Sequence, residues 1–228
     1  RILPPLFLFL VTFLIYLHNA SPSVYGGDVG DMLSAIAVRG IPHPSGYPLF
    51  TLLGILFSFL PIPQTLAWKV GLISVFSSSV SVVVMYLIIF ELVQKRLLAF
   101  VTALTLAFYY TFWLYAEIAE VFALTNFFIL LLFFLAIVYI QKKKIIFLYL
   151  LFFFAGLAVG HHEITILFLP SLALLVLRAN RKIFLKPVFV GKSFLLFFLG
   201  FLPYLYIPIA ASFDPPINWM GKVTLENV

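Results

Sequence analysis

The sequence predicts an all-α, polytopic membrane protein, and three observations lead to that class. Of the 228 residues, 64% are hydrophobic and only 10% are charged, whereas a soluble domain carries about 25% charged residues. The apolar residues form long runs that approach the roughly 20 residues needed for one spanning helix. Phe alone occurs 28 times, which is typical of a lipid-facing surface. There is no cysteine, so disulfides and thiolate metal sites are excluded.

Seven apolar runs indicate spanning helices. They cover residues 2–17, 70–93, 97–114, 121–140, two runs within 145–177 that are split at 160–163, and 188–211. A further run, 49–61, has only 13 residues and ends in Pro-Ile-Pro, which suits a re-entrant or interfacial segment. The first run has no small-residue cleavage site and therefore indicates a spanning helix instead of a signal peptide. We expect one transmembrane domain over 1–228, the N-terminal part of a longer protein. Its first extracytoplasmic loop, 18–69, would carry the non-spanning segment.

Charge placement predicts which side each loop faces, because basic residues gather in cytoplasmic loops. If 49–61 does not cross, eleven of the 14 basic residues fall inside, and seven of the eight acidic residues fall outside, Glu91 being the exception. All four histidines also fall outside. If 49–61 crossed, most basic residues would face outward. The net charge of +6 thus reflects the bilayer as partner and requires no nucleic acid. We expect a multi-pass cell membrane protein, in a bacterial inner membrane, with its polar motifs on the extracytoplasmic face.

The first outer loop contains two carboxylates, Asp28 and Asp31, at a spacing that puts them on one face of a helix start. One interpretation is a general base, with its partner holding a metal or an acceptor. The structural alternative is helix capping by Asp28, with Asp31 favoured by the helix dipole in the first turn. Both roles can coexist.

The stretch 39–50 is rich in Pro and Gly, which predicts a stiff, shaped loop. His43 lies between two prolines and is a candidate to bind phosphate or an acceptor, or to move a proton. The alternative is a solvated side chain on a rigid turn. Arg39 is one of few outer cations, so it is a candidate phosphate clamp, although a lone interfacial Arg is usually a snorkelling residue.

Three more polar motifs interrupt the apolar runs. Glu117 and Glu120 occupy a tight turn between two spans, where near-membrane carboxylates indicate a site. His161 and His162 precede Glu163 in a turn that we expect to lie below the outer surface; contact with a lipid phosphate or hydrogen bonding is favoured over a metal, because a zinc-protease spacing is absent. The last motif, 214–219, ends in Asn218 and Trp219, and its alternative is a plain interfacial exit with an aromatic anchor.

These stretches, taken in order, resemble a bacterial family long classed as a domain of unknown function, whose animal relatives are transmembrane protein O-mannosyltransferases. HPSGYPLF at 43–50 and PPINW at 215–219 are the most specific pieces. The others are Asp28-Val29-Gly30-Asp31, Trp68 with Val70, FW at 112–113, EVFAL at 120–124, GLAVGHH at 156–162 and YLYIPIAA at 204–211. The resemblance covers nearly the whole chain. Two departures are that Asp31 is often Glu in the family and that family members are usually longer.

The family is similar to the GT-C glycosyltransferases, multi-spanning enzymes that use a polyprenyl-phosphate sugar. The resemblance implies that a sugar, mannose in the animal relatives, moves with inversion to a hydroxyl of a protein or glycan acceptor. It implies Asp28 or Asp31 as the catalytic base, and a carboxylate in the first outer loop is the family's usual choice. No cofactor is required by it, and a divalent metal is left open. The residues expected to bind substrate are Arg39, His43, Tyr47, Glu117, Glu120, His161, His162, Asn218 and Trp219, of which Arg39 and the three histidines would contact phosphate.

Two other functional classes remain open. A membrane transporter or lipid flippase would place polar or charged residues near the middle of its spans, and the predicted span centres here are almost purely apolar. A structural or receptor-like membrane protein without chemistry would not need five polar motifs on one face. The sequence therefore favours a membrane glycosyltransferase.

Overall fold

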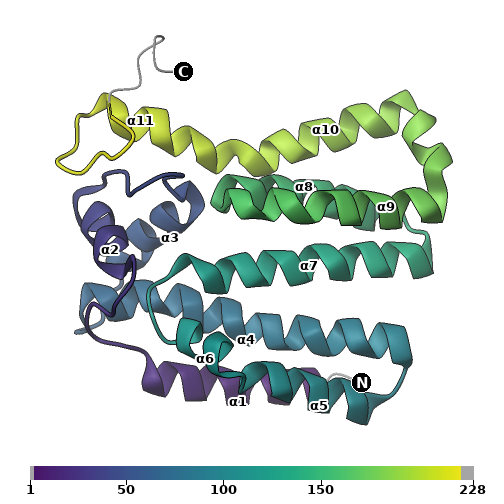
Figure 1. The fold of residues 1–228 in the computed structure, drawn as a ribbon, viewed down its shortest axis with the longest axis horizontal. Helices are drawn as coiled ribbons and strands as arrows, with labels where there is room; N and C mark the ends of the chain where they lie inside the picture. Colours follow the sequence, from purple (N-terminus) through teal and green to yellow (C-terminus); the bar gives the residue numbers. More distant parts are fainter. Residues whose placement is uncertain (1–2, 222–228) are drawn as a thin grey trace.

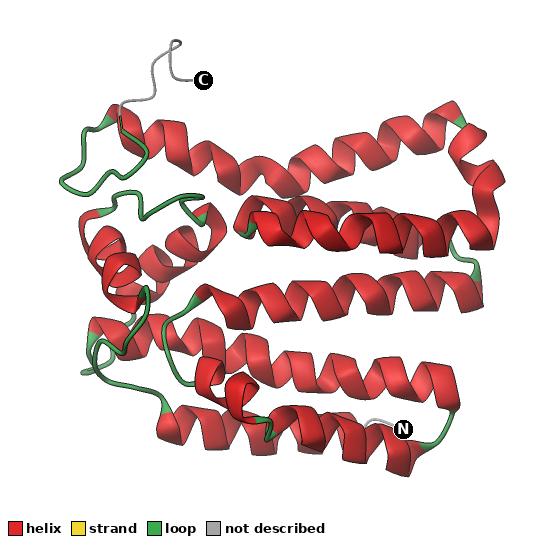
Figure 2. Cartoon of the chain, in the orientation of Figure 1, coloured by secondary structure: helices red, strands yellow, loops and turns green. Residues whose placement is uncertain are grey.

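The computed structural model describes residues 3–221, and in that range it contains helices and no named β-strand (Figure 2). The long helices lie along the longest axis of the molecule, and short helices and loops gather at one end (Figure 1). This arrangement confirms the all-α, polytopic membrane class. Arg1 and Lys222, which entered the charge count, lie outside the described residues.

The first predicted span is α1 (Leu3–Asn19), and the predicted first loop, 18–69, contains two short helices, α2 (Val29–Val38) and α3 (Pro48–Ser58). Pro48 opens α3, where its missing N–H leaves no helical hydrogen bond unmade. The 11 residues of α3 extend over about 16 Å, about half of the hydrocarbon thickness of roughly 30 Å. α3 lies beside α2 and packs against α4 and α8.

The centre of the bundle is α4 (Leu66–Val93), which packs against α1, α5 (Arg96–Ala107) and α7 (Val121–Lys142). α5 continues into α6 (Tyr110–Ala116) through a bend of 67°. The close packing of α4 follows from small side chains, because serine lets helix backbones approach. Its buried serines are Ser74, Ser77, Ser78, Ser79 and Ser81.

A second group of helices completes the bundle. It consists of α8 (Ile146–His161), η1 (Glu163–Phe168), α9 (Leu169–Asn180), η2 (Arg181–Leu185), α10 (Pro187–Phe201), η3 (Leu202–Leu205) and α11 (Tyr206–Ser212). α8 and α10 meet at Gly156 and Gly200. A Cβ on Gly156 would lie 2.0 Å from the Phe197 carbonyl oxygen, and one on Gly200 would lie 2.0 Å from the Phe153 carbonyl oxygen. Glycine is therefore required for this backbone contact.

The helix lengths agree with several membrane spans. Four segments are long and apolar enough to cross: 66–93, 121–142, 163–185 and 187–212; the bent α5–α6 pair makes a fifth. α1 and α8 coincide with the two other predicted spans but have only 17 and 16 residues. The turns α4–α5, α7–α8 and α9–α10, which hold most basic residues, lie at the end of the bundle opposite α2, α3 and α11 (Figure 1).

Candidate functional site

The candidate site begins at the start of α2, where Asp28 occupies the N-cap position. Gly27 turns the chain there with a φ of 78°, a conformation that costs glycine little. The Asp28 carboxylate makes no capping hydrogen bond, and 61% of the side chain is exposed. The backbone N–H of Asp28 instead donates to Glu120 Oε1 at 3.1 Å. Asp28 therefore takes the cap position while its carboxylate stays available.

Asp31, in the first turn of α2, is held by hydrogen bonds on both oxygens. Its Oδ2 accepts from the backbone N–H of His43 at 2.9 Å and from His43 Nδ1 at 2.7 Å. Its Oδ1 accepts from the Trp219 indole Nε1 at 2.8 Å. Only 21% of the Asp31 side chain is exposed. The two carboxylates of the motif thus have different environments, one open and one enclosed.

His43 connects the two carboxylates. With Nδ1 on Asp31, its other nitrogen, Nε2, faces Asp28 Oδ2 at 3.6 Å and the Tyr47 hydroxyl at 3.3 Å. The Tyr47 ring lies edge-on to the His43 ring at 5.2 Å and to the His162 ring at 5.3 Å. Burial, and then the charge of Asp28, raise the pKa of Tyr47, so its hydroxyl stays protonated at neutral pH.

The C-terminal segment reaches this site through a short backbone pairing. Ile41 and Asn218 form a parallel bridge, in which Ile41 N–H donates to the Ile217 carbonyl at 2.9 Å and Trp219 N–H to the Ile41 carbonyl at 3.2 Å. Gly40 permits the approach, since a Cβ there would lie 2.2 Å from the Ile217 carbonyl oxygen. Asn218 Nδ2 donates to the Gly221 carbonyl at 2.8 Å. The pairing places Trp219 against Asp31, while the Trp219 side chain remains exposed.

The two glutamates of the α6–α7 turn have separate surroundings. Glu120 is buried, and its Oε2 accepts from the Val121 N–H at 3.1 Å while Oε1 accepts from Asp28 N–H. Burial raises the pKa of Glu120, although these backbone N–H groups oppose the shift. Glu117 accepts from the Trp113 indole N–H, and burial raises its pKa as well. Glu120 thus joins α7 to the start of α2, and Glu117 pairs with Trp113.

His161 and His162 both contact Thr125 of α7, a residue that belongs to none of the sequence motifs. Thr125 Oγ1 lies 3.2 Å from His161 Nε2 and 3.0 Å from His162 Nδ1. His161 is 1% exposed, whereas His162 is half-buried and its ring faces Tyr47 and Phe122. Burial lowers the pKa of His162, and the charge of Glu163 opposes this. In the sequence, Thr125 was marked only by being a polar residue inside an apolar run.

Two predicted site residues stand apart from this group, Glu117, which pairs with Trp113, and Arg39. Arg39 ends α2 with a φ of 55°, ten residues after the helix begins, and its guanidinium lies 5.8 Å from the centre of the Phe59 ring. The structure therefore brings together Asp28, Asp31, His43, Tyr47, Glu120 and Trp219, with His162 on the far side of Tyr47. Within residues 3–221, no cluster of three His, Cys, Asp or Glu side chains has a metal-binding arrangement.

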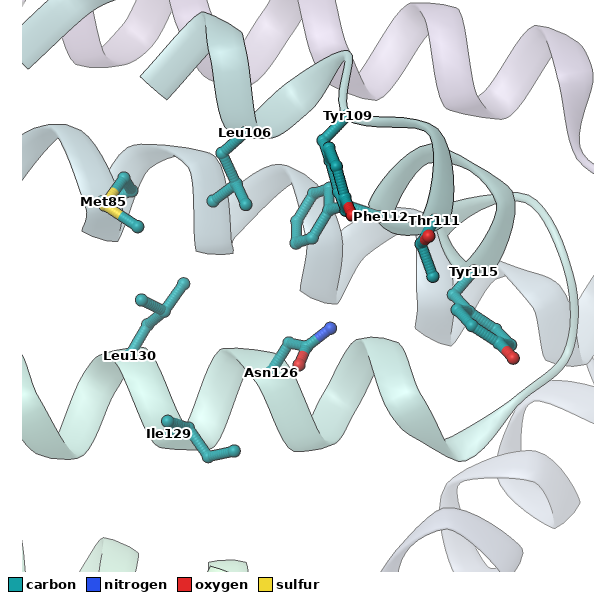
Figure 3. A pocket seen from close by; sticks show the side chains of 9 residues that line it. All are labelled: Met85, Leu106, Tyr109, Thr111, Phe112, Tyr115, Asn126, Ile129 and Leu130. Atoms are coloured by element: carbon teal, nitrogen blue, oxygen red, sulfur yellow. The ribbon is translucent and has the colours of Figure 1, made fainter. Parts of the chain in front are cut away.

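A separate cavity of about 310 Å³ lies between α4, the bent α5–α6 pair and α7 (Figure 3). Its lining residues are Met85, Leu106, Tyr109, Thr111, Phe112, Tyr115, Asn126, Ile129 and Leu130. No predicted site residue lines it. Its Tyr115 ring packs at 4.7 Å on Phe122, whose ring lies 6.2 Å from that of His162. Aromatic contacts thus connect this mostly apolar cavity to the histidine side of the site.

Comparison with known proteins gives one family and two curated relatives. Residues 28–183 match the family described as the Protein O-mannosyl-transferase TMEM260 N-terminal domain. The Protein O-mannosyl-transferase tmem260 of Dictyostelium discoideum is 35% identical over 124 residues, which cover 54% of this chain and 15% of that protein. The Protein O-mannosyl-transferase TMEM260 of Mus musculus is 28% identical over 210 residues, which cover 90% of this chain and 30% of that protein. The chain thus corresponds to less than a third of either relative. No solved structure matches it.

Proposed function

The chain belongs to the family of the Protein O-mannosyl-transferase TMEM260 N-terminal domain, and from this membership we propose that it is the membrane part of a glycosyltransferase. The names of both relatives support a transfer of mannose to protein. We further propose a GT-C mechanism, in which the donor is a polyprenyl-phosphate sugar and the acceptor is a protein hydroxyl. The main support for the proposal is that the Asp28 carboxylate is exposed to solvent, while the neighbouring Asp31 is mostly buried and paired with His43.

Asp28 is the proposed general base. A base must reach the proton of the acceptor hydroxyl, and the Asp28 carboxylate is 61% exposed with His43 as its side-chain neighbour. Asp31 is less suited to this role, because its two oxygens already accept from His43 and Trp219. The difference in exposure supports Asp28 over Asp31, two acids that the sequence left equivalent.

Asp31 and His43 are proposed to position the reacting groups. Asp31 holds Nδ1–H of His43, so the nitrogen directed toward Asp28 is Nε2. In its imidazolium form His43 donates from Nε2 and supplies positive charge where the departing phosphate develops negative charge. Among the residues assigned to phosphate from the sequence, His43 is the one beside the acids, since Arg39 lies at the other end of α2.

In the proposed reaction the acceptor hydroxyl oxygen attacks the anomeric carbon as the bond from that carbon to the phosphate oxygen breaks. The hydroxyl proton passes to Asp28, and polyprenyl phosphate leaves with the electron pair. The basic turns lie at the opposite end of the bundle (Figure 1), which by the positive-inside rule supports an extracytoplasmic site. For a bacterial chain, that is the outer face of the inner membrane.

The test uses the full-length protein with polyprenyl-phosphate mannose and a secreted-protein acceptor. Asp28→Asn removes the base and keeps the shape of the side chain, so kcat is expected to fall by roughly 10²–10⁴-fold. Glu91→Gln is the control, because Glu91 is an acid outside the site that pairs with Lys142 at 3.5 Å at the opposite end of the bundle. That control is expected to transfer at the wild-type rate.

Two results would overturn the proposal in different ways. Wild-type activity in a correctly inserted Asp28→Asn variant would remove Asp28 from the mechanism while leaving the transferase intact. Absence of transfer from any lipid-linked sugar by the wild-type protein would remove the transferase itself and favour a membrane transporter or lipid flippase.

A further inference from the structure

The arrangement around Thr125 determines which ring nitrogens of two histidines carry hydrogen. Thr125 Oγ1 donates to the Val121 carbonyl oxygen at 2.9 Å, and a carbonyl oxygen only accepts. The hydroxyl hydrogen is therefore used, and Thr125 offers its lone pairs to other partners. His161 Nε2 and His162 Nδ1 lie 3.2 and 3.0 Å from that oxygen. His161 Nε2 also lies 3.2 Å from the Val121 carbonyl oxygen, so it is a donor to both oxygens. With the Thr125 hydrogen on the same carbonyl, His162 Nδ1 donates to Thr125.

This arrangement leaves a lone pair on the outward nitrogen of His162. With its hydrogen on Nδ1, a neutral His162 has an acceptor at Nε2, and Nε2 has no hydrogen-bond partner within the described part of the chain. The ring lies between Tyr47 and Phe122, at 5.3 and 6.2 Å, and Phe122 is 37% exposed. His162 therefore presents an acceptor between two aromatic rings.

We propose that His162 determines sugar specificity by accepting a hydrogen bond from one hydroxyl of the transferred hexopyranose, and that Thr125 is the residue that positions it. This inference rests on the proposed transferase function and assigns the sugar side of the same site. His161 supports Thr125 from the buried side, because it is 1% exposed and its Nε2 contacts both Thr125 and the Val121 carbonyl oxygen.

The same geometry argues against a phosphate at His162. A phosphate oxygen is an acceptor and would face the lone pair of Nε2, whereas a hydroxyl donates to it. Burial also lowers the pKa of His162, which disfavours the cation that a phosphate would require. Tyr47 contacts His162 with its ring and His43 with its hydroxyl. A sugar against His162 would therefore be separated from the Asp28–His43 pair only by Tyr47.

The experiment compares polyprenyl-phosphate mannose with a set of deoxy analogues, each lacking one sugar hydroxyl, on the full-length protein. With the wild type, kcat/KM for one analogue is expected to be about tenfold or more below that for the complete donor, because the loss of one hydrogen bond to a sugar hydroxyl weakens binding by about that factor. Thr125→Val keeps the shape of the side chain but removes the lone pairs, and His162→Phe removes the acceptor. Both are expected to lower kcat/KM for the complete donor and to abolish discrimination against that one analogue.

Two further variants separate this role from a structural one. Thr125→Ser keeps the hydroxyl and is expected to restore the discrimination that Thr125→Val loses. Thr105→Val is the matched control, because Thr105 makes the same hydrogen bond to a carbonyl four residues back, Val101 at 3.0 Å, on the exposed face of α5. It should leave the discrimination unchanged.

The outcomes are distinct. Wild-type discrimination in both Thr125→Val and His162→Phe overturns the inference, as does a wild type that treats all deoxy donors alike. Weaker inhibition by polyprenyl phosphate in His162→Phe, with discrimination intact, would assign His162 to phosphate and also overturn it. If the wild type transfers no sugar at all, the proposed function fails first.

Discussion

His43 and His162 are oriented in the same way by different partners. Each donates from Nδ1, His43 to the carboxylate of Asp31 at 2.7 Å and His162 to the hydroxyl of Thr125 at 3.0 Å. Both histidines are half-buried; the first lies between two carboxylates at the start of α2, and the second lies where α8 ends. A carboxylate brings a negative charge to its histidine, whereas a hydroxyl brings none, and burial lowers the pKa of His162.

The different partners of the two rings suit histidine to two different roles in the proposed site. The His43 region carries the negative groups and suits proton transfer and developing charge. The hydrogen-bond partner of His162 is the uncharged hydroxyl of Thr125, and Glu163 is the charge next to it. This surrounding agrees with the proposed recognition of a sugar hydroxyl. Glu120 joins the two regions, because it accepts from the N–H groups of Asp28 and Val121, and the Val121 carbonyl accepts from Thr125. Tyr47 joins them on the other side.

The largest effect is expected from Asp31→Asn, which gives His43 a neutral partner and so makes the first region resemble the second. An amide can turn its NH₂ toward Nδ1 and favour the wrong tautomer, and it weakens the hold on the Trp219 indole. Transfer is expected to fall by about 10²-fold or more, measured as kcat with polyprenyl-phosphate mannose. A variant with full activity would show that the charge of Asp31 is unimportant and that only the shape of the pair matters.

Glu120→Gln is expected to act on stability, since it tests the link between the regions. A glutamine replaces one acceptor by an N–H donor facing a backbone N–H, which costs about 1–3 kcal/mol in the free energy of unfolding. Burial raises the folded-state pKa of Glu120 above 4.5. The folded chain therefore holds more protons than the unfolded chain between the two pKa values, and stability falls as pH rises through that window.

Thermal unfolding of the detergent-solubilised protein over this pH range checks the prediction. The wild type should lose stability as the pH rises above 4.5, and Glu120→Gln should show a shallower dependence together with lower stability at low pH. An unchanged slope in the variant would mean that another group accounts for the pH dependence.

The smallest effect is expected from Tyr47→Phe. This change removes the hydroxyl that lies 3.3 Å from His43 Nε2 and keeps the ring that contacts both histidines. At that distance the hydrogen bond is weak, so kcat is expected to fall by only about threefold to tenfold. Discrimination among deoxy donors should persist, because the His162 side is intact. Loss of that discrimination would show that the Tyr47 hydroxyl itself orients the sugar.

Several features were predictable from local patterns alone. The apolar runs predicted the helices because an apolar segment of about 20 residues has few alternatives in a bilayer. The short run 49–61 predicted a segment too brief to cross, and it corresponds to the 11-residue α3 at the end of the bundle that also holds α2. The loop that holds Asp28, Asp31 and His43 was recognisable from the sequence, because two carboxylates and a histidine between prolines are unusual next to apolar spans.

Other features depended on distant contacts. Trp219 reaches Asp31 across 188 positions, and Glu120 reaches Asp28 across 92; no spacing rule relates such residues. Thr125 carried only a weak signal, because a threonine in an apolar helix usually bonds to its own backbone. Arg39 was grouped with the acids by its nearness in sequence, yet the ten residues of α2 carry it to the opposite end of that helix.

The class of protein, the helical segments and the end of the bundle at which basic residues gather follow from the sequence alone, because hydrophobicity, length and charge are properties of each segment. The packing of the helices makes Asp28 the open acid and Asp31 the enclosed one, and it brings Thr125 against His162. Those distinctions arise from hydrogen bonds between segments far apart in the chain. Such bonds form only when the helices pack and bring their ends together.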